Sequence, residues 1–552
     1  LSAYAVNNFE PALVFDFKGN YFRKSATAST FPASITHAAS TNATMTDGYG
    51  PEVVTNGKFG TDTAGWVSGS SAATSAAVSG EMQVTNVSSN GRVITAIPTV
   101  VGRQYEVSGV GRVISGAGGP AASLYLTNST GSTIQGGNIN YTTTDAPLGL
   151  FFTATATTSY ISAITFGNVG NVSAFDNVSV RQSPALKWRP HNTLSYSEDL
   201  TNSNWVKQVS ATVDLNVAAA PDGSMTASRL TFGGSFSNLR QIGAAVTGAT
   251  ATTKVWIKLE SGNANLAFGI SAAQFDILNV TSEWVEYSTT DTEVASNGKG
   301  FLLQDRNSSG FGSVLIWHPH SFRSDLGGMV NNPDTTSSYV PTTTSAVYAP
   351  RRGHHIYNGS AWVNEGILHE SEARTNLLPN SSVLGYSKLN TATSISTVVS
   401  PSGLQDAVLV QPTVASGITW VYDLTVYNTG VVTTISTFAK ASGKSFVTMP
   451  NSNGNVSYAS FNLTTGAVGT VASGYTANIE DFGNGWYRCS VTTPTGFNER
   501  AVYAVSDTDG ANVAAANGND GILLYGAQLE AGSTPSSYIP TGSASVTRAA
   551  ET

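Results

Sequence analysis

Hydrophobic and polar residues alternate in short runs along most of the chain. Clear runs are residues 253–259 (TKVWIKL), 314–317 (VLIW), 455–463 (NVSYASFNL) and 521–525 (GILLY), and clusters of Gly, Asn, Ser and Asp separate them. A period of two with many β-branched and aromatic residues is typical of half-buried antiparallel strands. We find no convincing run with a helical period. The pattern therefore predicts an all-β protein of tandem antiparallel β-sandwiches with jelly-roll topology.

Two stretches of the chain share landmarks in the same order, which indicates a repeated module. The matching pairs, from opener to centre to end, are residues 192–198 (NTLSYSE) and 375–381 (TNLLPNS), 255–258 (VWIK) and 437–440 (TFAK), and 337–342 (SSYVPT) and 536–541 (SSYIPT). Several matches in one order are hard to obtain by chance. We expect two copies of about the size of one β-sandwich domain.

A third, more divergent copy precedes these two. It opens with residues 54–59 (VTNGKF) and closes with 175–180 (FDNVSV). The predicted organisation is listed here from the N-terminus: an extended arm or assembly segment at 1–50, a first jelly roll at 51–183, a second at 184–350, and a linker plus a third at 351–552. We expect the arm to pack on another subunit or on the first sandwich.

The composition excludes several classes of function. The 552 residues have a net charge of −8 and only 11% are charged, so no basic surface for nucleic acid is expected. No window approaches the roughly 18 apolar residues of a membrane span. The single Cys excludes an internal disulfide framework and Cys-based zinc sites. Hydrophobic residues at 40% are sufficient to form buried cores.

The second module contains a candidate glycan-binding face. If Val255 and Ile257 point into the core, the opposite face of that strand presents Lys254, Trp256 and Lys258. A flat aromatic ring can stack on the C–H face of a sugar, and polar side chains can bind its hydroxyl groups. The pattern thus predicts a stacking platform at Trp256.

The corresponding positions in the third module are Phe438 and Lys440. They are candidates for the same role. The alternative for both modules is that these aromatic residues pack against a neighbouring strand, loop or subunit.

Catalysis has little support in the sequence. Glycosidases use two carboxylates about 5–9.5 Å apart, and the adjacent acids Glu480 and Asp481 diverge in direction on a strand or turn. His318 and His320 could form a metal pair, but no third ligand is evident. We therefore expect a protein that is not an enzyme.

The modules resemble the carbohydrate-binding-module-like jelly rolls of tailed-bacteriophage tail, tail-fibre and related virion proteins. The resemblance is found in residues 195–200 (SYSEDL, followed by Trp205), 372–378 (EARTNLL), 479–491 (IEDFGNGWYRCSV) and 523–550 (LLYGAQLEAGSTPSSYIPTGSASVTRAA). It covers essentially residues 51–552 and implies a protein of the virion surface, in the tail. The implied partners are other virion proteins and host cell-surface glycan.

Such jelly rolls often hold a structural calcium ion. Asp507 and Asp509 have the i, i+2 spacing of some calcium loops, so they are the candidate metal ligands. A simple Gly-Asp hairpin turn is the alternative. No other cofactor is expected.

Three functions remain open from the sequence. The first is a tail or tail-fibre component that attaches to the host surface, as a homo-oligomer and specifically a trimer, although no coiled-coil heptads support that order. The second is a purely structural head or tail decoration protein that binds only virion subunits. The third is a bacterial secreted adhesin, or the accessory modules of a glycoside hydrolase.

Overall fold

The computed structural model describes most of the chain. The described residues are 13–16, 21–24, 27–30, 38–243, 249–263, 265–271, 273–292, 299–306, 312–332, 338–428, 430–450, 457–494 and 498–552. Within them, strands dominate and the one helix is a 3-10 turn, η2 (Val383–Gly385). The all-β prediction is confirmed. In this part of the chain no helix has the length and apolar character needed to cross a membrane.

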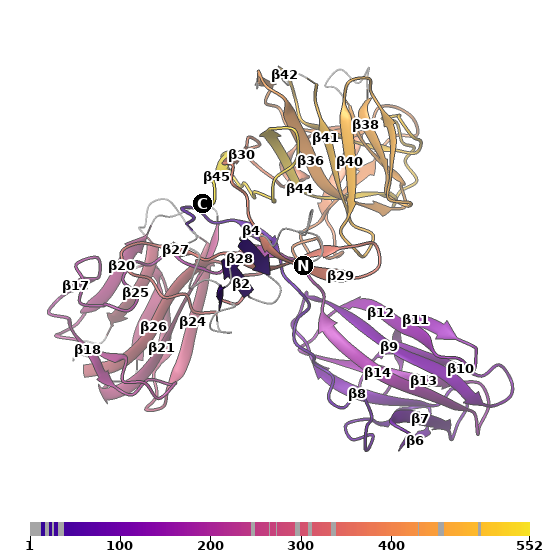
Figure 1. The fold of residues 1–552 in the computed structure, drawn as a ribbon, viewed down its shortest axis with the longest axis horizontal. Coiled ribbons are helices and arrows are strands. Elements are labelled where there is room, and N and C mark those ends of the chain that lie inside the picture. The colour runs from indigo at the N-terminus through magenta and orange to yellow at the C-terminus, as the bar shows by residue number, and fades with distance from the viewer. Residues whose placement is uncertain are drawn as a thin grey trace. The chain divides into compact units, whose positions relative to one another are not determined.

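Residue contacts divide the chain into two compact units (Figure 1). The first comprises Gly48–Ala185 and Ile395–Ala407, and we call it the single-sandwich unit. The second comprises Leu1–Asp47, Leu186–Ser394 and Val408–Thr552, and we call it the two-sandwich unit.

The single-sandwich unit contains two five-stranded antiparallel sheets, purple in Figure 1. The spatial order of one sheet is β11 (Thr133–Asn140), β10 (Ala121–Thr127), β13 (Thr158–Phe166), β8 (Arg92–Pro98) and β5 (Val67–Ser68). The order of the other is β12 (Ala146–Thr153), β9 (Gln104–Ser115), β14 (Val172–Gln182), β7 (Glu81–Asn86) and β6 (Ala73–Val78). Phe59, Trp66 and Phe175 lie in the apolar core of this sandwich.

The second sandwich, in the two-sandwich unit, also has two five-stranded sheets. One has the order β17 (Val206–Gln208), β20 (Asn238–Gly243), β25 (Lys299–Asp305), β22 (Asn265–Ser271) and β23 (Gln274–Asn279). The other has the order β18 (Thr212–Ala218), β19 (Ala227–Thr231), β26 (Gly312–Arg323), β21 (Thr250–Gly262) and β24 (Val285–Thr292). Trp205, Phe268 and Phe301 lie in its core.

The third sandwich belongs to the same unit and has two six-stranded sheets. One has the order β31 (Ser387–Leu389), β34 (Trp420–Tyr422), β43 (Val502–Ser506), β37 (Phe446–Pro450), β38 (Ser457–Asn462) and β39 (Ala467–Val471). The other has the order β32 (Thr391–Ile395), β33 (Val408–Pro412), β44 (Gly521–Ala531), β36 (Thr433–Ser442), β41 (Tyr487–Thr492) and β40 (Thr476–Asp481). Phe461, Cys489 and Tyr503 lie in its core.

Short sheets occur outside the sandwiches. They pair β15 (Leu186–Trp188) with β4 (Thr44–Thr46), β16 (His191–Asn192) with β27 (Val347–Tyr348), β28 (Arg351–Tyr357) with β29 (Trp362–Leu368), β30 (Arg374–Asn376) with β45 (Val546–Arg548), and β35 (Tyr427–Asn428) with β42 (Asn498–Glu499). The predicted N-terminal arm, residues 1–50, contains an antiparallel meander of β1 (Leu13–Asp16), β2 (Tyr21–Lys24) and β3 (Thr27–Thr30). These strands fold back on one another instead of extending as one arm. The rest of residues 1–37 lies outside the described residues.

A buried asparagine occupies the same position in the second and third sandwiches. The side-chain amide of Asn192 donates to the carbonyl oxygen of Val340 at 2.9 Å. The amide of Asn376 donates to the carbonyl oxygen of Ile539 at 2.9 Å. In both cases the asparagine also accepts a bond from the backbone N–H two residues later. The openers and closers predicted from the repeat are therefore in direct contact.

A serine and a threonine make a second matching contact. The backbone N–H of Thr342 donates to the Ser197 hydroxyl at 2.8 Å. The backbone N–H of Thr541 donates to the Ser381 hydroxyl at 3.0 Å. These bonds link the first residues of each sandwich to the Pro-Thr that ends it.

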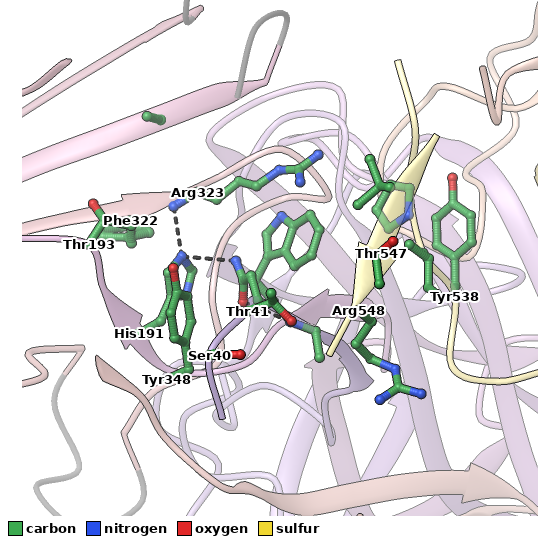
Figure 2. A pocket seen from close by; sticks show the side chains of 17 residues that line it. Ser40, Thr41, His191, Thr193, Phe322, Arg323, Tyr348, Tyr538, Thr547 and Arg548 are labelled. Carbon is green, nitrogen blue, oxygen red and sulfur yellow. Dashed lines mark hydrogen bonds between the residues drawn. The ribbon is translucent and has the colours of Figure 1, made fainter. Parts of the chain in front are cut away.

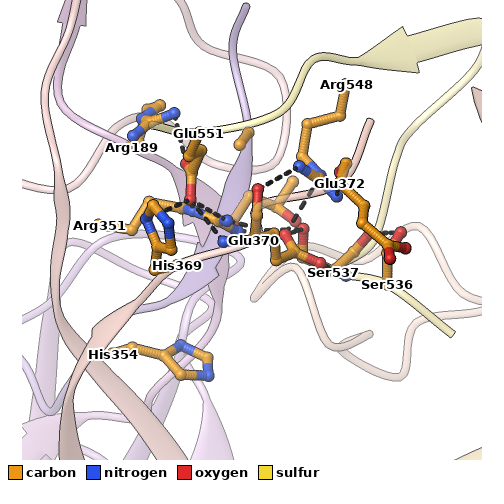
Figure 3. A network of polar contacts seen from close by, with 12 residues as sticks. Arg189, Arg351, His354, His369, Glu370, Glu372, Ser536, Ser537, Arg548 and Glu551 are labelled. Carbon is orange, nitrogen blue, oxygen red and sulfur yellow. Dashed lines mark hydrogen bonds and ion pairs between the residues drawn. The ribbon is translucent and has the colours of Figure 1, made fainter. Parts of the chain in front are cut away.

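Five charged side chains form a buried ionic cluster in the two-sandwich unit, and Figure 3 shows them: Arg189, Arg351, Glu370, Arg548 and Glu551. Glu551 lies 2.8 Å from both Arg189 and Arg351, and the side chains of all three are at most 1% exposed. Glu370 lies 2.7 Å from Arg351 and 3.2 Å from Arg548. The cluster joins residues that precede both sandwiches to residues near the end of the chain.

Candidate ligand-binding faces

Strand β21 has the alternation that the sequence predicts. Val255 and Ile257 are fully buried in the core of the second sandwich. Lys254, Trp256 and Lys258 lie on the opposite, outward face and are half-buried. The structure thus brings these three predicted residues together on one surface.

Four aromatic rings form a continuous row across this face, and we call it the aromatic row: Trp256, Trp317, His318 and Tyr339. The pairing of β21 with β26 places Trp317 opposite Trp256, with ring centroids 6.5 Å apart. His318 stacks on Trp317 at 3.3 Å and on Tyr339 at 3.7 Å. Sequence reasoning missed Trp317 as part of the face because only the register between β21 and β26 makes it a neighbour of Trp256.

Two ion pairs lie on the same sheet as the aromatic row. Lys254 lies 3.5 Å from Glu286 on β24. On the other side, Arg229 makes two 2.6 Å bonds to Glu260. The indole N–H of Trp317 donates to the Thr226 hydroxyl at 3.0 Å. The face therefore combines flat apolar rings with fixed hydrogen-bond donors and acceptors.

His318 has an unusual backbone conformation, with φ at +53°. The matching residue of the third sandwich is Gly526, with φ at +65°. Gly526 follows Tyr525 on β44 in the same way that His318 follows Trp317 on β26. A left-handed conformation is unfavourable for a residue other than glycine, and such strain is often found at functional sites. Burial lowers the pKa of His318 to about 3, so its imidazole is neutral at pH 7.

The imidazole rings of His318 and His320 do not face a common point where they could bind a metal ion together. The His318 ring lies in the aromatic row, whereas Nε2 of the buried His320 is 2.8 Å from the carbonyl oxygen of His191. In the described ranges, no three or more His, Cys, Asp or Glu side chains lie together in a group that could hold a metal ion.

The equivalent face of the third sandwich is covered, and the prediction that Phe438 offers an open stacking surface is wrong. Phe438 is 2% exposed, and Phe482 packs against it at 5.1 Å between ring centroids. Phe482 in turn contacts Trp362 of hairpin β28–β29 at 5.1 Å. Nζ of Lys440 donates to the carbonyl oxygen of Asn484 at 2.6 Å. The packing alternative is therefore confirmed for Phe438.

The two candidate calcium ligands have separate partners. Asp507 forms a 2.7 Å ion pair with Lys444 and accepts a bond from the backbone N–H of Ala515. Asp509 accepts bonds from the backbone N–H and the hydroxyl of Thr470. These contacts tie the two carboxylates to different neighbouring segments of the third sandwich.

A cavity of about 250 Å³ lies within the two-sandwich unit (Figure 2). Figure 2 shows His191 and Tyr348 on one side and Tyr538 and Arg548 on the other. The His191 imidazole stacks on Tyr348 and accepts a 2.9 Å bond from the backbone N–H of Arg323. Burial lowers the pKa of His191 to about 3, so this ring is a neutral structural element.

Comparisons with known proteins match the fold only weakly. No protein-family model matches the chain, and no curated protein matches it. A solved tandem of CBM22 domains from Paenibacillus barcinonensis Xyn10C is 12% identical, with a TM-score of 0.22, over 52% of this chain and 100% of that one.

Two further solved structures have similar scores. Tandem CBM51 modules of a family 98 glycoside hydrolase from Streptococcus pneumoniae are 11% identical, with a TM-score of 0.22, over 53% of this chain and 98% of that one. The enzymatically active domain of bacteriophage CBA120 tailspike protein 4 is 14% identical, with a TM-score of 0.19, over 23% of this chain and 21% of that one. TM-scores of this size support no conclusion about function.

Proposed function

We propose that this protein binds glycans without transforming them, and that the aromatic row of the second sandwich is the binding surface. The observation on which the proposal depends is the half-buried Trp256–Trp317 pair on an outward sheet face with charged residues on both sides. Sugar rings have apolar C–H faces and polar hydroxyl edges. A surface of this composition complements both.

The polar groups beside the row are preorganised by their own contacts. Glu286 lies opposite Trp256 in the β21–β24 pairing and is held by Lys254, and the Arg229–Glu260 pair lies further along the same sheet. Preorganised side chains lose less conformational entropy when a ligand binds. The face is thus suited to shallow, reversible binding.

The absence of catalysis is part of the proposal. The hydrogen bond from Arg229 lowers the pKa of Glu260, and a general acid at neutral pH needs a raised pKa. Glu286 is paired with Lys254. The acids beside the aromatic row therefore match a binding role better than glycosidic bond cleavage.

We further propose a place in the tail or tail fibre of a tailed-phage virion, where the protein attaches to host surface glycan. The motifs at residues 195–200, 372–378, 479–491 and 523–550 support this proposal by their resemblance to virion jelly rolls. A single shallow site near 1 mM corresponds to only about −4 kcal/mol. Repetition of the chain in a homo-oligomer, expected to be a trimer, can raise avidity by roughly 10²–10⁴.

A purely structural virion role is the second candidate. The observation that favours it is the burial of Phe438, because there the chain itself fills the face that the second sandwich leaves open. A bacterial adhesin or glycosidase accessory protein would use the same aromatic row.

A glycan array with the full chain tests the proposal. Removing the Trp256 ring in Trp256→Ala should weaken binding by about tenfold or more, since burial of a large apolar side chain contributes roughly 1.5–3 kcal/mol. Tyr141→Ala, a 66% exposed aromatic residue of the first sandwich, is the matched control and should bind normally.

Three other outcomes separate the candidates. Unchanged glycan binding by Trp256→Ala would reject the aromatic row as the binding surface. A wild-type chain that binds no glycan but binds purified virion subunits would support the structural role. Release of reducing sugar from host polysaccharide would show that the protein is an enzyme.

A further inference from the structure

A second cavity, of about 550 Å³, lies beside the hairpin β28–β29 on the outward face of the third sandwich, and we call it the hairpin cavity. Its volume is within the roughly 300–1,000 Å³ of small-molecule sites. The lining residues that matter here are Tyr357, Trp362, Glu480, Asp481, Phe482 and Arg488. His354, Glu370, Ser536 and Ser537, which also line it, are labelled in Figure 3.

Aromatic rings form one wall of the hairpin cavity. Trp362 contacts Tyr357 at 5.7 Å and Phe482 at 5.1 Å, both edge to face. Phe482 rests on the buried Phe438, which fixes its position. Because Trp362 and Tyr357 are half-buried on the hairpin, part of each ring surface is accessible.

Hydrogen-bonding groups of both kinds line the same cavity. Arg488 on β41 donates to the carbonyl oxygen of Ser536 at 2.7 Å and lies 5.5 Å from the centre of the Phe438 ring. Its buried Nε–H has no acceptor in the part of the chain that the structure describes. Glu480, which is exposed, faces Arg488 across the β40–β41 pairing. The guanidinium thus retains donor capacity, and the carboxylate is available as an acceptor.

The composition of the cavity defines the chemistry of a ligand. A purely apolar molecule would leave the buried Nε–H of Arg488 without an acceptor and would use none of the acceptor capacity of Glu480, so it would match the cavity poorly. An anion would be repelled by the two carboxylates of Glu480 and Asp481. A neutral compound with apolar ring faces and several hydroxyl groups satisfies the aromatic wall, the donors and the acceptors together.

We infer that the hairpin cavity is a second binding site, separate from the aromatic row, for a neutral saccharide. The repeat gives a reason for two different sites in equivalent modules. Where Glu286 lies opposite Trp256 in the second sandwich, Arg488 lies opposite Phe438 in the third, and the hairpin adds a wall. This inference takes from the proposed function only the expectation that the ligand is a saccharide.

Saturation-transfer NMR on the full chain tests the inference, with cellobiose, maltose, lactose and chitobiose as neutral probes and glucuronic acid as the anionic probe. Trp362→Ala removes the aromatic wall, and Glu480→Ala removes an exposed acceptor without disturbing the core. Each should weaken the binding of at least one neutral disaccharide by about tenfold. Glu283→Ala, an exposed acid of the second sandwich, is the control and should not change it.

The two proposals fail in different ways. The hairpin-cavity proposal is wrong if Trp362→Ala and Glu480→Ala leave disaccharide binding unchanged. It is also wrong if the protein binds only glucuronic acid, or binds none of the probes. If Trp256→Ala abolishes that same binding, the proposed function stands without the cavity. If Trp256→Ala has no effect while the two cavity variants lose binding, the cavity stands and the aromatic row does not.

Discussion

At the scale of single residues, the buried asparagines Asn192 and Asn376 hold the two repeated sandwiches closed. Each satisfies backbone groups from both the first and the last segment of its sandwich. The sequence repeat contains both residues, but the pattern alone gives no reason for an asparagine there. The reason is geometric, because a side-chain amide can donate and accept at once.

The first prediction concerns Asn376→Ala. Buried backbone groups of Leu378, Leu529 and Ile539 lose a partner, at roughly 1–3 kcal/mol for each unsatisfied group. We expect a loss of about 3 kcal/mol or more, measured as a lower melting temperature by calorimetry. Asn380→Ala, which removes a solvent-exposed turn bond to Ser382, should change the melting temperature little. Equal effects of the two variants would contradict this account.

The second prediction concerns Gly526→Ala. The backbone at Gly526 has φ +65°, and an added Cβ would lie 3.1 Å from the Tyr538 ring and 3.3 Å from Phe438. The left-handed conformation alone costs roughly 1–2 kcal/mol for a residue with a Cβ. We expect a destabilisation of about 1–3 kcal/mol in denaturant titrations. Gly385→Ala, where an added Cβ has no neighbour within 4 Å, is the matched control. If Gly526→Ala and Gly385→Ala change the stability equally, the backbone at Gly526 relaxes without cost and this account is wrong.

Part of the candidate site could be predicted at this scale. The alternation of β21 placed Lys254, Trp256 and Lys258 on one face because a period of two fixes the direction of each side chain. The same logic failed for Phe438. Its burial depends on Phe482 and Trp362, which lie far away in the sequence and reach it only through tertiary packing.

At the scale of elements, strand pairing decides which surfaces remain open. The runs at 253–259 and 521–525 were predictable as strands, and both are strands in the structure. The shift in register between Lys254 and Trp256, which aligns Trp256 with Trp317, has no local signal. The hairpin β28–β29 lies within the predicted linker, and no local sequence pattern predicts that it covers a sandwich face.

The third prediction concerns the turn with Asp507 and Asp509. Because Lys444 and Thr470 occupy these carboxylates, we expect EDTA to leave the melting temperature unchanged and added calcium not to raise it. The measurement is calorimetry with and without chelator. A calcium-dependent rise that Asp507→Asn abolishes would instead establish the structural ion that the sequence suggested.

At the scale of the whole molecule, the buried ionic cluster brings together five charged side chains from separate parts of the two-sandwich unit. Burial alone would raise the pKa of Glu370, but Arg351 and the bonds from Ser537 outweigh it and bring that pKa to about 2. The pKa of Glu551 is also lowered: burial opposes the shift, and the hydrogen bond and charge of Arg351 cause it. Composition could not predict this cluster, since its members come from distant parts of the chain.

The fourth prediction is loss of stability in acid. A carboxyl with a folded pKa of about 2 and a usual value of 4.5 stabilises the fold fully above about pH 4.5. That contribution, roughly 3 kcal/mol for Glu370, disappears as the pH falls from about 4.5 through about 2. We expect the melting temperature of the two-sandwich unit to fall steeply over this range.

Glu370→Gln provides the control for the acid prediction. It should unfold at a lower temperature at pH 7, because removal of one partner leaves buried arginine charge uncompensated. Its melting temperature should also depend less on pH between about 4.5 and 2. An unaltered pH profile in this variant would assign the acid sensitivity to other carboxylates.

The paired closures at Asn192 and Asn376 have a consequence for how such a protein can evolve. Folding constraints concentrate on a few positions that tie each duplicate together, which leaves the outer surface of β21 free to diverge. One duplicate can then acquire a new specificity while its sibling keeps the old one. Among natural variants, we expect the closure residues to stay fixed and the residues around Trp256 to vary.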